Sequence, residues 1–177
     1  MPQTLLSIAG LLIVTLLSFS QQQTNLSTQQ AAVRAEMQQM AIGVAKKSVE
    51  VVRARAFDDS TKSGDPPPSE LTKFEDFPAE KNGKDRKDCR AFGGSDTCDS
   101  IEDFHEMTPA IDSVSVPGGT FAFKIEIEVH YVDSDLNRTS NRTERKEVAI
   151  RVRDDRGPNQ EPLLHEPITF TEVLGYV

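Results

Sequence analysis

Three oxygen-bearing side chains, Asp133, Asp135 and Asn137, form the pattern in this sequence that most resembles a metal site. They alternate with other residues in the segment DSDLN, and calcium loops present carboxylate and amide oxygens at such alternate positions. A calcium loop also needs a glycine at its turn, and Arg138 stands at that place. The segment is therefore predicted to be a polar hairpin loop, with calcium binding as the weaker alternative.

The same loop holds two N-glycosylation sequons, which begin at Asn137 and Asn141, and a third sequon begins at Asn25. The sequon is short and often arises by chance, but in a secreted protein it marks a surface loop. Two sequons side by side agree with an exposed loop. They make Asn137 and Asn141 candidates for glycosylation.

The chain has two cysteines, Cys89 and Cys98, and the pair Gly93-Gly94 lies between them. No CxxC or CxxCH motif is present, so a zinc ribbon, a thioredoxin-type redox site and a c-type haem are unsupported. Two unpaired thiols are one interpretation. We prefer a disulfide across the short loop, which would stabilise the fold by about 2–3 kcal/mol in an oxidising compartment.

No set of residues has the spacing of a catalytic site. His105, His130 and His165 have no metal-ligand spacing with each other or with the cysteines. The segment GGSD lacks the pattern of a nucleophile elbow, and the sequence has neither a P-loop nor a dinucleotide fingerprint. The chain is predicted not to be an enzyme and to bind no cofactor.

The first element that positions these residues is apolar. Residues 5–19 contain no charge. A buried core helix would need protein on every side, and a signal peptide would carry Lys or Arg before its apolar run. A helix over residues 1–20 would be about 30 Å long, close to the hydrocarbon thickness of a bilayer. We prefer a membrane segment with the apolar residues Leu5, Leu6, Ile8, Leu11, Leu12, Ile13, Val14, Leu16, Leu17 and Phe19.

Residues 21–57 are predicted to continue the helix as an amphipathic half. One stripe at helical spacing contains Leu26, Val33, Met37, Met40, Val44, Ser48 and Val51. A helix over about residues 2–57 is on the order of 80 Å long, more than a domain of about 120 residues can cover. We expect the second half to pack on its own domain. The first half, with Leu26, Val33, Met37 and Met40, should need partners.

The rest of the chain is predicted to form a small antiparallel sheet after a loop region. Residues 58–118 show little periodicity and are expected to be irregular. Residues 119–177 alternate apolar and polar side chains, which predicts strands at about 120–132, 144–153 and 167–176. Glu126 or Glu128 should pair with Arg151 or Arg153 across two strands. The fold class is therefore α+β, with a long N-terminal helix before the sheet.

Charge is distributed unevenly between these parts. The chain carries −8, and residues 1–56 hold five bases and two acids, so residues 57–177 carry −11. An acidic domain argues against nucleic acid and against anionic lipid as its partners.

This order of parts resembles type IV pilins and pseudopilins, over residues 1–57 by pattern and over the sheet by architecture. The resemblance implies a subunit anchored in a membrane before assembly, whose N-terminal helices then bundle with copies of themselves in an extracellular filament. If Met1 is the first mature residue, Leu5 stands where the family carries an acid. The alternative function is a membrane-anchored or secreted binding module that forms a small coiled coil through the stripe that starts at Leu26.

Overall fold

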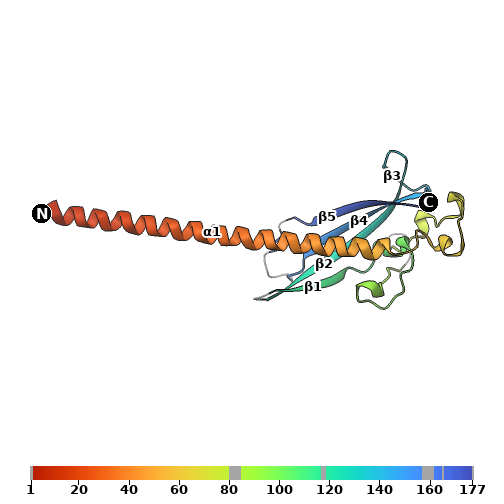
Figure 1. Cartoon of the computed structure of the whole chain (residues 1–177), viewed down its shortest axis with the longest axis horizontal. Coiled ribbons are helices and arrows are strands. Elements are labelled where there is room, and N and C mark those ends of the chain that lie inside the picture. Colours follow the sequence, from red (N-terminus) through yellow and green to blue (C-terminus); the bar gives the residue numbers. More distant parts are fainter. Residues whose placement is uncertain (1, 80–84, 117–118, 157–161, 165, 177) are drawn as a thin grey trace. The chain divides into compact units, whose positions relative to one another are not determined.

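The computed structural model describes residues 2–79, 85–116, 119–156, 162–164 and 166–176, except the side chains of residues 2–9 and 12. One long helix precedes a five-stranded antiparallel sheet with long loops, so the predicted α+β class is confirmed (Figure 1). The chain divides into two compact units, Met1–Met37 and Gln38–Val177.

Helix α1 runs from Pro2 to Arg53. Its only proline is in the first turn, where the missing N–H has no partner to lose, and no later proline interrupts it. The helix ends four residues earlier than the predicted residue 57. The amide of Arg55 bonds to the carbonyl of Val52 in a tighter turn, and Ala56 then pairs with Ser100 in a parallel bridge. This early end lets the chain bring Asp58 into the core, where it is fully buried.

The sheet has the order β1-β2-β4-β5, and the short β3 pairs with β2. The strands are β1 (Ala110–Val116), β2 (Gly119–Val132), β3 (Arg138–Thr139), β4 (Arg145–Asp154) and β5 (Ile168–Gly175). Strands β2, β4 and β5 occupy the three segments predicted to be strands, to within a residue at each end. Strand β1 lies inside the segment predicted to be irregular, so the sheet starts earlier than the sequence indicated.

The core lies on one face of the sheet, as the alternation predicted. The inward side chains of β2 and β4 are at most 1% exposed: Phe123, Ile125, Ile127, Val129, Tyr131, Val148, Ile150 and Val152. The C-terminal part of α1, residues 38–53, lies beside the sheet (Figure 1), and it buries Ala41, Val44, Ala45, Ser48, Val49 and Val52. On the outer face Glu126 is opposite Arg151 and contacts Arg153 at 3.1 Å, which is the predicted pairing.

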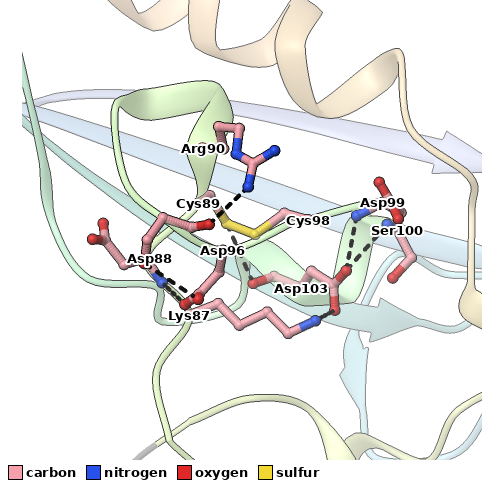
Figure 2. The surroundings of a disulfide bond; sticks show 10 residues. Lys87, Asp88, Cys89, Arg90, Asp96, Cys98, Asp99, Ser100 and Asp103 are labelled. Atoms are coloured by element: carbon pink, nitrogen blue, oxygen red, sulfur yellow. Dashed lines mark hydrogen bonds and ion pairs between the residues drawn. A yellow bond between two sulfur atoms is a disulfide. The ribbon is translucent and has the colours of Figure 1, made fainter.

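The segment between α1 and β1 consists of short 3₁₀ turns held by a disulfide. Cys89 and Cys98 are bonded, as predicted, and both are almost fully buried. Figure 2 shows how side chains fix the backbone around this bond. The carboxylate of Asp103 accepts hydrogen bonds from the amides of Asp99 and Ser100, and that of Asp96 accepts one from the amide of Asp88. Buried Phe77 and Phe104 pack this region against the core.

Candidate functional site

The uncovered apolar side chains of α1 are the first candidate site. Each is 59–68% exposed in the part of the helix between residues 11 and 19: Leu11, Ile13, Val14, Leu16, Leu17 and Phe19. The side chains of Leu5, Leu6, Ile8 and Leu12, which belong to the same predicted surface, lie outside the described residues. Large exposed apolar patches are rare on soluble monomers and usually mark an interaction surface.

The apolar surface changes shape along the helix. At 3.6 residues per turn, the exposed side chains between Leu11 and Phe19 point to all sides of the helix. Further along, Leu26 and Val33 are also exposed, but they are seven residues apart and lie on one side. The first stretch therefore exposes apolar side chains all round the helix, while the second exposes them along one side.

The uncovered stretch ends at Glu36. Met37 is fully buried and Met40 is half-buried, although both were predicted to need partners together with Leu26 and Val33. From Met37 onward, the side chains of the stripe are buried or half-buried within the chain itself. We name the exposed residues 10–36 of α1 the assembly surface, with residue 12 left out because its side chain is not described.

Five hydroxyl side chains of this surface have hydrogen-bond partners within the helix. The hydroxyls of Thr15, Ser18 and Thr24 each donate to a carbonyl four residues earlier, at 2.9–3.0 Å. Ser27 and Thr28 both donate to the carbonyl of Thr24 at 2.9 Å. Such back-bonding lets a hydroxyl enter an apolar environment without a partner from another molecule.

The structure describes part of the predicted membrane segment at residues 1–20. No helix in the described part of the chain has a stretch both long enough and apolar enough to span a membrane. Residue 1 and the side chains of residues 2–9 and 12, which belong to that segment, are not part of the description.

The calcium candidate, Asp133 to Asn137, is a turn in which the Asp133 side chain bonds to backbone amides. One oxygen of Asp133 accepts the amides of Asp135 and Asn137, both at 2.9 Å. Glu144 stands twelfth from Asp133, where a calcium loop has its closing glutamate. Even so, no three acidic, histidine or cysteine side chains within the described ranges are grouped to hold a metal. Asn137 and Asn141 are both exposed, as their sequons require.

A second candidate site, which the sequence reasoning missed, is a buried charge cluster of Lys146, Asp58 and Glu102. The Lys146 side chain is 0% exposed. Its ammonium group donates to Asp58 Oδ2 at 2.8 Å, to Glu102 Oε2 at 2.7 Å and to the carbonyl of Phe57 at 2.7 Å. Lys146 comes from β4, Asp58 caps the first 3₁₀ turn (Asp59–Ser63), and Glu102 lies in the turn Ile101–Phe104. Three distant segments therefore meet at one nitrogen.

The two carboxyl groups of the cluster are shifted in opposite directions. Burial raises the pKa of Glu102, and Lys146 offsets this only in part. Burial also acts to raise the pKa of Asp58, but Lys146 and Thr72 together outweigh it and lower the pKa to about 2. Asp58 is therefore ionised, while Glu102 holds a proton more readily than a free glutamate.

Aromatic side chains enclose the cluster. The Lys146 nitrogen lies 4.6 Å from the ring centre of Phe57, 5.3 Å from that of Phe77 and 5.2 Å from that of Tyr131. The Tyr131 hydroxyl is 3.1 Å from Asp58 Oδ2, and burial, with the carboxylate of Asp58, raises the pKa of that phenol. The site is dry, charged and closed to solvent.

One sequence signal pointed to Lys146. It has the same parity in its strand as Val148, Ile150 and Val152, which all face the core. Strand alternation therefore places it inside. Nothing local in the sequence indicates that Asp58 and Glu102 meet it there.

No family model matches this chain, and no curated protein and no solved structure shows significant similarity to it.

Proposed function

We propose that this chain is a structural subunit of a pilus-like extracellular filament and that it polymerises through its N-terminal helix. The observation that carries the proposal is the assembly surface, where six large apolar side chains between Leu11 and Phe19 are uncovered on all sides of one helix. Burying such side chains is favourable by about 1.5–3 kcal/mol each. Several copies of the helix bundled together would supply that burial.

The charges of the helix support a partner of the same kind. Residues 1–33 contain no Asp, Glu, Lys or Arg, so bundling over this part of the helix desolvates no ionised side chain, and Arg34 and Glu36 lie at the end of the assembly surface. The hydroxyls of Thr15, Ser18 and Thr24 already have partners in their own helix. In this proposal lipid covers the apolar end before assembly, and sibling helices replace the lipid afterwards.

The geometry of the surface favours an open assembly over a closed pair. A helix that is apolar on all sides must contact several neighbours, whereas a dimer interface would use one side. Repeated contacts between different sides of identical helices produce an open filament when the rotation from copy to copy does not close into a ring. The acidic unit, Gln38–Val177, would face solvent, and its disulfide suits an oxidising compartment outside the cytoplasm.

Mutation of the apolar surface tests the proposal. Ile13→Lys and Leu16→Arg each place a charge among the bundled helices, and electron microscopy of cell-surface material should then show no filaments. The matched control is Gln21→Lys, which adds the same charge at an exposed polar position of the same helix and should have a smaller effect. Normal filaments from Ile13→Lys and Leu16→Arg would overturn the proposal.

A second candidate is supported by the spacing of Leu26 and Val33. Exposed apolar residues seven apart on one side are typical of a coiled-coil seam. In that case the chain is an anchored or secreted binding module that stops at a few copies. Sedimentation of the purified chain in mild detergent separates the two, because a coiled coil gives one small defined mass and a filament subunit gives larger polymers as detergent is withdrawn.

A further inference from the structure

The buried charge cluster has no place in assembly, because its three ionisable groups are closed to solvent. We propose that Lys146 and Asp58 condense to an intramolecular amide bond, with Glu102 as the acid–base group that carries the protons. The product would be a covalent link between β4 and the segment that follows α1. This inference is independent of the filament proposal.

The reacting groups are already in contact. The Lys146 nitrogen lies 2.8 Å from Asp58 Oδ2, and both side chains are 0% exposed. Groups held at such a distance react as if at very high concentration, because folding has already paid the entropy cost of bringing them together. No external enzyme is needed to bring them together.

The carboxylate of Asp58 is arranged to accept a nucleophile. Its Oδ1 accepts four hydrogen bonds, from the amide and hydroxyl of Ser60 and from the amide and hydroxyl of Thr72, at 2.8–3.2 Å. Donors fixed around one oxygen stabilise the negative charge that develops on it in a tetrahedral intermediate. The other oxygen, Oδ2, faces Lys146 and Tyr131, so it is the oxygen that would leave.

Glu102 can move the protons that the reaction requires. Its Oε2 is 2.7 Å from the Lys146 nitrogen, and its raised pKa suits a group that alternates between acid and base. Glu102 takes one proton from the ammonium of Lys146 and passes it to Oδ2 of Asp58, so that a neutral amine faces a carboxylic acid. The nitrogen then attacks Cγ of Asp58, and Glu102 passes the second proton to Oδ2, which leaves as one water. The ammonium and carboxylate become an amide and water, so atoms and charge balance without an oxidant or co-reactant.

The environment favours the product. Phe57, Phe77 and Tyr131 surround the nitrogen and exclude water, so the ammonium and carboxylate are held where both ions are poorly solvated. An amide carries no net charge and removes this penalty, while the released water can leave the dry site. Oδ1 keeps its donors from Ser60 and Thr72 as the carbonyl oxygen of the new amide.

Mass spectrometry of the full-length chain, denatured and reduced, tests the bond. The chain should be lighter than its sequence by one water. Trypsin should release peptide 56–62 joined to peptide 146–151, because amidated Lys146 no longer permits cleavage after it. A chain of full sequence mass would overturn the proposal, as would water loss found in an unbranched peptide or a bond from Lys146 to Glu102.

Two variants separate the chemistry from the fold. Glu102→Gln keeps the ion pair of Lys146 and Asp58 but removes the proton carrier, and Asp58→Ala keeps Lys146 paired with Glu102 but removes the electrophile. Both should have full mass and a circular dichroism spectrum like that of the original chain. An amide formed to the same extent in Glu102→Gln would refute the role of Glu102. If both variants unfold, the mass and peptide map of the unaltered chain decide alone.

Discussion

The two compact units of this chain handle apolar and charged groups in opposite ways. The sheet unit, Gln38–Val177, buries its apolar side chains against each other and even encloses Lys146 with two carboxyl groups. In the helical unit, Met1–Met37, large apolar side chains stay uncovered and the first charged residue is Arg34. The described residues of the sheet unit form a core, whereas the helical unit exposes most of its described large apolar side chains.

The sharpest test of this contrast compares two phenylalanines. Phe77→Ala in the sheet unit should lower the free energy of unfolding by about 3–5 kcal/mol, because the ring is fully buried. Phe19→Ala, at a ring that is 62% exposed, should leave unfolding within about 0.5 kcal/mol and weaken assembly instead. Denaturant unfolding in detergent and a pelleting assay measure the two effects. Equal loss of stability in both variants would contradict the contrast.

The next effect concerns the charge cluster. Lys146→Met cannot be joined to Asp58, leaves two buried carboxyl groups without a cation and should destabilise the sheet unit by about 3–5 kcal/mol. Lys124→Met is the control, since this lysine also lies in the sheet and pairs with a glutamate but is 40% exposed. It should change stability by less than about 1 kcal/mol. Thermal unfolding of both variants gives the comparison.

Removal of the disulfide should have a smaller effect. Replacing Cys89 and Cys98 by serine opens a loop with a sequence separation of nine and should lower stability by about 2–3 kcal/mol. The loss should appear in denaturant unfolding of the sheet unit, and filament formation should persist at low temperature. Loss of filaments with an intact sheet unit would show that the loop itself contacts a neighbour.

Acid should weaken the ion pair in the Glu102→Gln variant, where Lys146 and Asp58 stay unlinked. The pKa of Asp58 is 3.8 when unperturbed and about 2 in the fold, so the unfolded chain binds the proton first as pH falls. The contribution of ionised Asp58 to the free energy of unfolding is present above pH 3.8, and about 2 kcal/mol of it is lost as the pH falls to about 2. Unfolding measured across this range should show the loss, and a variant that also carries Asp58→Ala should not show it.

The fold followed from the sequence where side chains alternate strongly. In β2 and β4, β-branched or aromatic residues occupy every second position, so both strands were predicted to within a residue or so. Strand β1 was missed because its sequence, AIDSVSV, has small polar residues and leaves Ile111 exposed. It is a strand because it pairs with β2, and its own residues have little preference for that conformation.

The candidate sites were predicted to different degrees. Composition alone identified the apolar stretch of the helix. It did not show that buried side chains begin at Met37, because burial depends on tertiary contacts. The disulfide followed from loop length and glycines. The charge cluster did not follow, because Asp58, Glu102 and Lys146 are far apart in the sequence and converge only when the segment after α1 meets β4.

The back-bonded hydroxyls of α1 bear on the mechanics of any assembly built from it. Thr15, Ser18 and Thr24 donate inside their own helix, so none of these three hydroxyls has to break a bond to a neighbour when one helix slides along another. Only dispersion contacts, which re-form after each small step, would resist the motion. A filament built from such helices would therefore extend under tension and return to its original length when the tension is released.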